Sequence, residues 1–360
     1  MKKSLLALAV LGAFAGVASA QSSVTLYGTL DVNGRYVKAD GRQRSLTEGT
    51  DGINSSQLGF KGTEDLGGGL KAGFVLLAGV NPDSGTSNTK FFNRRSTVSL
   101  FGNFGEVRLG RDYTPTFWNM TLFDAFGTNG IGSSLDVRQL YNGTRQDNTI
   151  GYFLPSTLGG LYGQAMVGAA EQGTSGDRAA RYVGARLGFA AGPFDIAAAA
   201  SQERFATGVT GSGSIGDTGT NPAPVTGAIA GNSQKTYNLG GSFDFGVVKL
   251  LGYVNRDTIN NLRENMGSIS LVAPIGQGEL HAGYDRSKMT GRPAPLADSA
   301  TVDQFKVGYV YNLSKRTAVY TTVSRLSNKG DTTLTLPGAS GQTVASGKST
   351  GAEFGVRHFF

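Results

Sequence analysis

The chain has 360 residues, including 55 glycines, and its 33 basic and 26 acidic residues give a formal charge of +7. The glycines follow no G-X-Y repeat, which excludes a collagen-like chain, and 20 Phe with 13 Tyr are too many aromatic residues for a disordered chain. Cysteine is absent from the sequence, which excludes disulfides and thiolate-bound metals, and two histidines offer little for a histidine-based metal centre. We therefore expect neither a cofactor nor a metal.

The N-terminus is typical of a bacterial secretory signal peptide. Two lysines follow Met1, an apolar stretch runs from Leu5 to Val17, and Ala18-Ser19-Ala20 has the small residues of a cleavage site. A membrane anchor is the alternative, but the apolar stretch is shorter than the ~20 residues that a bilayer span needs. We therefore expect a signal peptide at 1–20 and a mature domain at 21–360. The mature chain carries no basic cluster, which argues against nucleic acid as a partner.

Beyond residue 20 the sequence alternates apolar and polar residues with a period of two, as β-strands do. One face of the first such segment holds Val24, Leu26, Gly28, Leu30, Val32, Gly34 and Tyr36, and the other holds Thr25, Tyr27, Thr29, Asp31, Asn33 and Arg35. The segments 236–245 and 304–313 alternate in the same way. Such strands fit either a sheet packed on a core or the wall of a barrel between lipid and water.

The lengths of the connections between the strands separate these two alternatives. Short connections are predicted at 65–69, 103–105, 190–193, 244–246, 274–278 and 313–315. Long polar connections are predicted at 38–54, 114–142, 205–232, 288–300 and 328–348. Short turns that alternate with long loops are typical of an outer-membrane barrel, whose short turns face the periplasm. The count of segments predicts an all-β fold, a transmembrane antiparallel β-barrel of about sixteen strands around a water-filled lumen.

Short motifs spread over the whole mature chain carry a family resemblance. They are 24–28 (VTLYG), 58–72 (LGFKGTEDLGGGLKA), 92–94 (FNR), 102–105 (GNFG), 109–111 (LGR), 147–148 (DN) with Tyr152, 313–317 (LSKRT) and 355–360 (GVRHFF). In this order and spacing the chain resembles the Gram-negative general diffusion porins, which are trimeric sixteen-stranded outer-membrane barrels. The resemblance implies a homotrimer in the outer membrane that passes small hydrophilic solutes by passive diffusion.

In those porins the third external loop folds inward and narrows the channel opposite a row of basic side chains. Here this loop corresponds to Thr114 to about Gly132, and Asp124 is its only acid. By resemblance, Arg94 matches the arginine of the family's F-N-R strand, and Arg145, seven residues before Tyr152, matches the arginine that follows the loop. We predict that Arg94 and Arg145 line the constriction opposite Asp124.

Three further residues are candidates for the constriction on weaker grounds. Arg35 lies on the polar face of the first strand, whereas Arg138 is close enough to the loop to belong to it. Gln57 stands where related porins commonly carry arginine, so one position of the basic row is neutral. For every arginine the alternative is a solvated charge on the rim or wall. Arg95 follows Arg94, so we expect it on the opposite, outward face.

The predicted constriction holds more basic than acidic side chains, which favours anions. Asp31 and Glu106 share the lumen face and moderate this excess, so we expect a moderate anion preference. A solute-specific channel of the same fold is the alternative function. An enzyme is disfavoured, because His281 and His358 are the only histidines and neither forms a convincing pair with a nucleophile. A surface adhesin ranks equally low among the alternatives. We predict no catalytic residue.

The last strand of the predicted barrel ends on an aromatic residue. Phe354, Val356, His358 and Phe360 alternate onto one face. By resemblance, Phe360 corresponds to the C-terminal signal that the outer-membrane assembly machinery reads. The other interpretation is an aromatic residue at the membrane interface, and both interpretations can hold at once.

Overall fold

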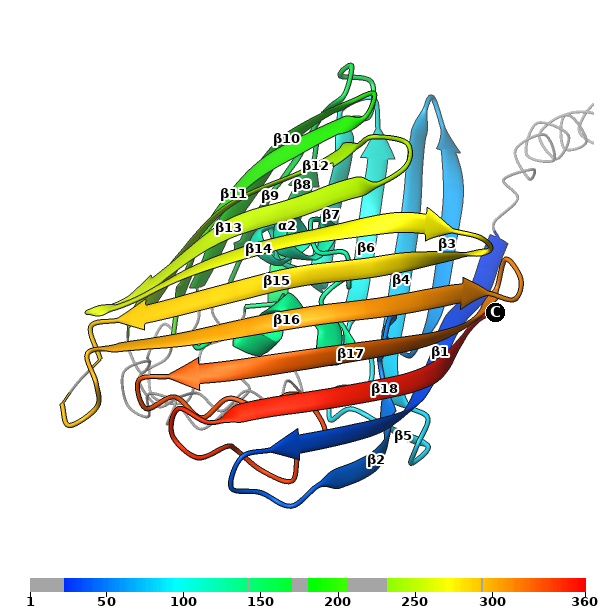
Figure 1. Ribbon diagram of the computed structural model, residues 1–360. Helices are drawn as coiled ribbons and strands as arrows, with labels where there is room; N and C mark the ends of the chain where they lie inside the picture. Colours follow the sequence, from blue (N-terminus) through cyan, green and yellow to red (C-terminus); the bar gives the residue numbers. More distant parts are fainter. Residues whose placement is uncertain (1–22, 141–142, 170–180, 206–231, 293) are drawn as a thin grey trace, which may run out of the picture.

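The structure, a computed structural model, describes residues 23–140, 143–169, 181–205, 232–292 and 294–360. The predicted signal peptide at 1–20 lies outside these residues, and so does most of the predicted loop at 205–232. Figure 1 shows a barrel of long strands. The strands of its wall are β1 (Ser23–Ala39), β3 (Gln57–Gly67), β4 (Leu70–Asn81), β6 (Arg95–Gly102), β7 (Gly105–Tyr113), β8 (Arg145–Phe153), β9 (Leu161–Gly168), β10 (Arg181–Ala191), β11 (Phe194–Arg204), β12 (Ser233–Asp244), β13 (Lys249–Ile259), β14 (Leu262–Ile275), β15 (Gly278–Thr290), β16 (Ser299–Asn312), β17 (Thr317–Lys329) and β18 (Lys348–Phe359).

These sixteen wall strands confirm the predicted fold and strand number. Each wall strand pairs antiparallel with its neighbours along the chain, and β1 pairs with both β3 and β18, which closes the barrel. Two further strands are short. β2 (Ser45–Thr50) pairs with Val32–Val37 of β1, and β5 (Thr86–Ser87) pairs with the end of β4. Within the described ranges, no helix has both the length and the apolar character to cross a membrane.

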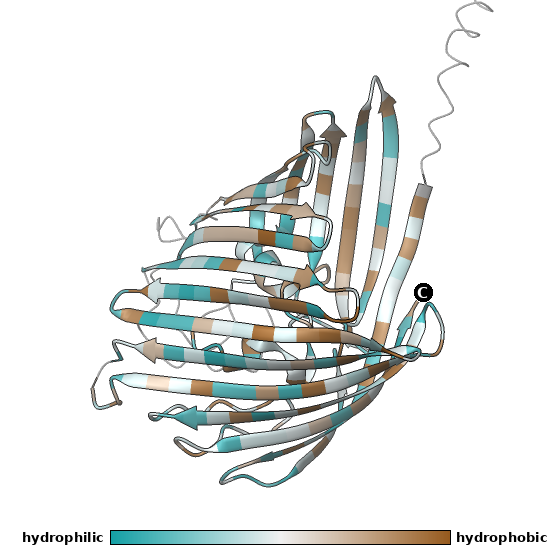
Figure 2. Cartoon of the chain, turned by 45° about the horizontal axis from the view of Figure 1, so that its top comes forward, coloured by the Kyte–Doolittle hydropathy of each residue, from teal (hydrophilic) through white to brown (hydrophobic). Residues whose placement is uncertain are grey.

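Side chains alternate between the two faces of the wall as the sequence predicts. On the outer face Leu26, Val254 and Phe305 are 54%, 59% and 62% exposed. Asn255 and Lys306, each the next residue along its strand, are buried on the inner face. Figure 2 shows the resulting alternation of hydrophobic and hydrophilic residues along the strands. Apolar side chains lie on the outside because the wall faces lipid.

The connections confirm most of the predicted turns. Each of the six short connections joins two consecutive wall strands. The predicted loop at 38–54 is wrong, because β1 continues to Ala39 and the backbone of Ser45–Thr50 pairs with it as β2. The two-residue hairpin between β13 and β14 was not predicted. Its Asn260 has a φ of 51°, a left-handed conformation that asparagine tolerates better than most residues.

A buried carboxylate stabilises residues 51–56, the irregular segment that separates β2 from β3. Asp31 of β1 accepts hydrogen bonds from the backbone N–H groups of Gly52, Ile53 and Asn54 at 3.1, 3.0 and 2.8 Å. The Tyr320 hydroxyl donates another. Asp31 is fully buried by these contacts. It therefore stabilises the segment 51–56. From the sequence we expected Asp31 to expose a negative charge to the lumen, and the structure shows it buried instead.

Candidate functional site

The described part of the segment between β7 and β8, residues 114–140 and 143–144, packs against the inside of the barrel, and we call it the inner loop. It contains α2 (Pro115–Leu122) and two 3-10 turns, η1 (Gly130–Gly132) and η2 (Ser134–Val137). α2 contacts β9 to β12, whereas η1 and η2 contact β15 to β18. The inner loop is thus attached to two separate parts of the wall, and α2 lies within the barrel (Figure 1).

Polar contacts fix α2 on the wall. Thr114 caps the helix by accepting a hydrogen bond from the backbone N–H of Phe117 at 3.3 Å, and Pro115 occupies the first turn. The Nδ2 atom of Asn119 donates to the carbonyl of Ala197 on β11 and to Oδ1 of Asn238 on β12, both at 2.9 Å. Because these partners come from two neighbouring strands, the bonds set both the position and the direction of α2.

A small hydrophobic core also joins the inner loop to the wall. It contains Met120, Phe123, Ile131 and Val137 of the loop, Val37, Ala197, Tyr253, Met266, Val302 and Leu326 of the wall strands, and Leu334 and Leu336 of the loop between β17 and β18. Phe123 lies against the wall at Gly240, where an added Cβ would come within 2.3 Å of its ring. This part of the barrel interior is therefore filled by side chains and not by water.

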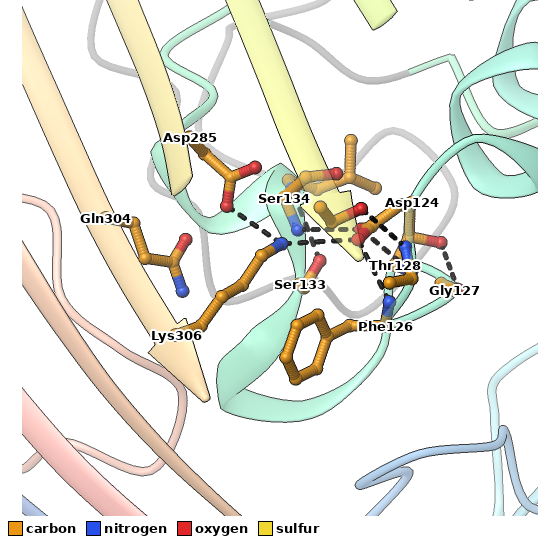
Figure 3. Close-up of polar contacts among 12 residues, drawn as sticks. Asp124, Phe126, Gly127, Thr128, Ser133, Ser134, Asp285, Gln304 and Lys306 are labelled. Atoms are coloured by element: carbon orange, nitrogen blue, oxygen red, sulfur yellow. Dashed lines mark hydrogen bonds and ion pairs between the residues drawn. The ribbon is translucent and has the colours of Figure 1, made fainter. Parts of the chain in front are cut away.

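A buried ion-pair network fastens the inner loop to β15 and β16 (Figure 3). Asp124 accepts hydrogen bonds from three backbone N–H groups of its own loop at 3.0 to 3.3 Å. The Nζ atom of Lys306 lies 3.2 Å from Oδ1 of Asp124 and 2.8 Å from Oδ2 of Asp285. All three side chains are 0% exposed. The single cation thus links an acid of the loop to an acid of the wall.

Asp124 is an anchoring acid whose charge is balanced. Burial by itself would raise the pKa of its carboxyl, but Lys306 and the backbone donors outweigh burial and hold that pKa below its usual value. Asp124 is therefore ionised at neutral pH. Lys306 lies on the polar face of the segment 304–313, so its inward direction was predictable. Nothing in the sequence connects it with Asp124, 182 residues away.

Two of the predicted arginines form buried ion pairs with acids of the wall. Arg35 of β1 has its Nη2 atom 2.9 Å from Oε2 of Glu353 on β18. Arg138 of the inner loop has its Nη2 atom 2.8 Å from Oδ2 of Asp257 on β13. A carboxylate balances the charge of each arginine. Arg35 thereby joins β1 to β18, the strands that close the barrel, and Arg138 joins the inner loop to β13.

The structure brings the other two predicted arginines together at Tyr113, the last residue of β7. The Nη2 atom of Arg145 donates to the Tyr113 hydroxyl at 2.9 Å, and its guanidinium lies 4.3 Å from the ring centroid. Arg94, at the position before β6, lies close enough for its charge to act on the same hydroxyl. The Tyr113 ring stacks on Phe117 of α2 with centroids 5.6 Å apart. The two arginines therefore lie where the inner loop leaves the wall.

Gln57 occupies a neutral position on the inner wall. It opens β3, where it pairs with Thr29 of β1 and Gly79 of β4. Gly59, two residues later on the same face, lies against the Tyr27 ring of the inner face, which places Gln57 on that face as well. No charge replaces the arginine that related porins commonly carry here.

The predicted outward direction of Arg95 is wrong. Arg95 shares its face with the buried Thr97 and Ser99, whereas Val98 between them is 53% exposed. The Nε atom of Arg95 donates to Oδ1 of Asp112 at 2.7 Å. In β6 the regular alternation of inward and outward side chains begins at Arg95. The prediction counted from Arg94 as an inward residue and therefore assigned Arg95 to the wrong face.

Arg95 belongs to a second ion-pair network that sequence reasoning missed. Asp112 pairs with both Arg95 and Arg108, and the Nε atom of Arg108 lies 2.7 Å from Oε1 of Glu106. Charges of both signs thus lie next to each other on the inner faces of β6 and β7. Glu106, which the sequence placed on the lumen face, has its charge balanced there by Arg108.

The inner loop has a second acid, because the loop extends beyond its predicted end. Asp136 lies in η2, and burial raises the pKa of its carboxyl well above the usual value even though Lys306 and Arg35 act in the opposite direction. Its Oδ2 atom is buried without a hydrogen-bond partner among the described residues. We therefore expect Asp136 to keep its proton at pH values where an exposed aspartate has lost it.

Comparison with known proteins shows where this architecture belongs. The profile of a family described as Gram-negative porin matches residues 7–331. The chain is 39% identical to outer membrane porin protein 32 of Delftia acidovorans, with 100% of both chains covered. This chain belongs to the Gram-negative porin family. The porin is also 29% identical to an outer membrane porin protein of Bordetella pertussis, again over 100% of both chains.

Solved porin structures share this fold. An anion-selective porin from Comamonas acidovorans matches with a TM-score of 0.81 and 34% identity, and the match covers 94% of this chain and 100% of that chain. The trimer form of OmpT of Vibrio cholerae matches with a TM-score of 0.67 at 16% identity, over 94% and 99% of the two chains. The protein is accordingly an outer-membrane channel for solutes and not an enzyme.

Proposed function

We propose that this porin passes small hydrophilic solutes and ions by passive diffusion with a moderate preference for anions. The observation that carries this proposal is the proximity of two cations, Arg94 and Arg145, to the Tyr113 hydroxyl beside the inner loop. Arg94 forms no ion pair with any carboxylate in the described ranges, and its Nε atom has no hydrogen-bond partner there. Basic side chains at a narrow part of a channel attract anions.

Several acids inside the barrel offset this preference only weakly. Asp112, Asp257, Asp124 and Glu353 each form an ion pair with a basic side chain. The fields of two opposite charges a few ångströms apart largely cancel at the distance of a passing ion. The similar porin from Comamonas acidovorans is described as anion-selective, which supports the same sign of preference for this chain.

The test is the zero-current potential of the porin across a KCl gradient in a planar bilayer. We expect the wild type to favour chloride, and Arg94→Ser and Arg145→Ser each to lower this preference, since each removes one positive charge beside the inner loop. The preference should also weaken with salt, because the Debye length falls from ~10 Å at 0.1 M to ~3 Å at 1 M.

A matched control removes the same charge from the outer face of the barrel. Arg256 is exposed on the outer face of β13, so Arg256→Ser should leave the zero-current potential unchanged. A cation-selective wild type would refute the proposed preference. An anion-selective wild type that neither Arg94→Ser nor Arg145→Ser alters would show that other residues set it.

The anion preference should decrease as pH rises through the raised pKa of Asp136. An acid with a raised pKa is neutral below that pKa and negative above it, so the inner loop gains a negative charge as pH rises. Relative to the unfolded chain, the contribution of Asp136 to stability is fully present below the ordinary aspartate pKa of ~3.9 and is lost as pH rises from there through the raised pKa. In Asp136→Asn the zero-current potential should no longer change there. An unaltered pH dependence in the variant would assign it to another group.

We further propose that the porin is a homotrimer and that the outer-membrane assembly machinery reads Phe360. The trimer form of the Vibrio cholerae relative supports the first part, and unheated detergent extracts should then show a heat-labile band of high mass. A single monomer band with and without heating would contradict it.

Phe360 is 40% exposed at the end of the last strand, so Phe360→Ser should reduce the amount of folded porin in cells. Unchanged amounts would contradict this role.

A further inference from the structure

A small apolar patch lies on the inner face of the wall, where the strands face water. Tyr27 of β1 and Leu77 of β4 are both directly opposite Gly59 of β3 in the ladders of these strands. A Cβ at Gly59 would lie 2.6 Å from Cζ of Tyr27 and 2.8 Å from Cδ1 of Leu77, so the two side chains meet over the glycine. Val75 lies two residues before Leu77 on the same face. We call Tyr27, Val75 and Leu77 the inner apolar patch.

The inner apolar patch lies away from the areas of the wall that the inner loop covers. α2 packs on β9 to β12, and η1 and η2 pack on β15 to β18, whereas the patch belongs to β1 and β4. Tyr27 and Val75 are partly exposed, and Leu77 is buried. Transfer of apolar surface out of water is favourable, so an apolar group that covers the patch would be stabilised there. The patch is therefore available to a solute in the channel.

An exposed cation lies at the edge of the patch. Lys61 of β3 stands directly opposite Val75, and its Nζ atom lies 5.1 Å from the centroid of the Tyr27 ring. The Lys61 side chain is exposed and forms no ion pair within the described ranges. At the other end of the patch, the backbone N–H of Arg94 donates to the carbonyl of Leu77 at 3.1 Å. The patch thus lies between two basic residues, and no carboxylate of the described part of the chain pairs with either of them.

These neighbours suit an anion that carries a flat apolar group. An aromatic ring can lie against Tyr27 in one of the offset or edge arrangements that aromatic pairs favour, while Val75 and Leu77 cover its apolar surface. A carboxylate on the same ring can accept a hydrogen bond from the Lys61 ammonium group. Chloride would gain only from the cation, and an uncharged ring would gain only from the patch.

We propose that the inner apolar patch and Lys61 bind aromatic carboxylates, so that the porin passes these anions in preference to polar anions of equal charge. The proposal rests on the anion preference proposed above, because positive charge beside the inner loop first concentrates anions in the channel. It adds a class of solute that charge alone cannot select, since a basic side chain attracts every small anion.

The test measures how added anions reduce the chloride current of the porin in a planar bilayer. The probes are sodium benzoate and sodium gluconate, which are both monovalent carboxylates. Benzoate carries an aromatic ring, whereas gluconate carries hydroxyl groups. An anion held in the lumen obstructs chloride, and only benzoate can stack on Tyr27, so benzoate should halve the current at a roughly tenfold lower concentration than gluconate.

Two variants locate the site. Val75→Thr/Leu77→Asn makes the patch polar without a change of charge, so benzoate should lose its advantage over gluconate while the zero-current potential in KCl stays that of the wild type. Lys61→Gln/Val75→Thr removes the cation together with part of the patch and should also abolish the advantage of benzoate. An unheated gel checks folding, and Val75→Thr alone replaces either double variant that does not fold.

The matched control is Lys249→Gln/Val272→Thr on β13 and β14. These two residues stand directly opposite each other, as Lys61 and Val75 do. Val272 shares the inner face of β14 with the buried Ser268 and Ser270. The control therefore makes the same two changes on another part of the inner wall, and its response to benzoate should be that of the wild type.

Three outcomes would overturn the proposal. The first is an anion-selective wild type whose current benzoate and gluconate reduce at equal concentrations. The second is an advantage of benzoate that persists in Val75→Thr/Leu77→Asn, and the third is its equal loss in the matched control. A cation-selective wild type that still responds to benzoate at the lower concentration would contradict the proposed anion preference and support the site for aromatic carboxylates.

Discussion

Replacement of Lys306 by methionine is expected to release the inner loop from β15 and β16. The substitution leaves Asp124 and Asp285, both 0% exposed, facing each other without the cation that lies between them. Removal of one partner from a buried ion pair typically costs ~3 to 5 kcal/mol. We expect the single-channel current of Lys306→Met to fluctuate and to close at voltages where the wild type stays open.

The control for this experiment removes the acids together with the cation. In Lys306→Met/Asp124→Asn/Asp285→Asn no buried charge is left unpaired, so the current should become steadier than in Lys306→Met alone. A steady current in Lys306→Met would show that the hydrophobic core and Asn119 hold the loop without the ion pairs. Because the pKa of Asp124 is lowered, its contribution to stability is present above its ordinary pKa of ~3.9 and is lost only as pH falls through the lower value of the folded state.

Replacement of Gly28 by valine is expected to prevent most chains from closing into a barrel. Gly28 and Phe360 exchange two backbone hydrogen bonds of 3.1 Å where β1 changes its partner from β3 to β18. A Cβ at Gly28 would lie 2.3 Å from the Phe360 ring and 2.6 Å from the carbonyl oxygen of Gln57. The ring can rotate, but the carbonyl belongs to the pairing of β1 with β3. The measurement is the fraction of refolded protein whose mobility on a gel changes with heating.

Gly34→Val provides the matched control. Gly34 lies on the same strand and the same outer face, and nothing lies within 4 Å of the Cβ that valine would add. This variant should fold like the wild type. If both variants lost the folded band equally, general intolerance of β1 to valine, and not the closing contact, would be the cause.

The wall of the barrel was predictable because lipid outside requires apolar side chains and water inside favours polar ones, so the two kinds alternate along each strand. The alternation of Val24, Leu26 and Leu30 with polar neighbours therefore gave both the strand and its outer face. The failures lie where the backbone departs from this rule. Ser45–Thr50 reads as a polar loop because Leu46 is its only apolar side chain. Arg95 begins the regular alternation of β6, in which the preceding Arg94 takes no part.

Within the candidate site, only contacts between residues on neighbouring strands could be predicted from the sequence. Arg94 and Arg145 meet at Tyr113 because β6, β7 and β8 are consecutive, so their pairing follows from the order of the chain. The contact of Asp124 with Lys306 depends instead on how far the inner loop reaches across the barrel. That reach is set by the packing of Met120, Phe123 and Ile131, which no local pattern in the sequence encodes.

Because of the small hydrophobic core inside the barrel, the free energy that attaches the inner loop to the wall depends on temperature. The lipid-facing side chains have no such dependence. Detachment of the loop would expose Phe123 and Ile131 to water and increase the heat capacity, whereas apolar residues on the outer face stay in hydrocarbon. Hydrophobic attachment weakens on cooling, and the cost of desolvating ion pairs rises on cooling. Both attachments of the loop therefore weaken on cooling, so the interior of the channel is loosened by cold as well as by heat.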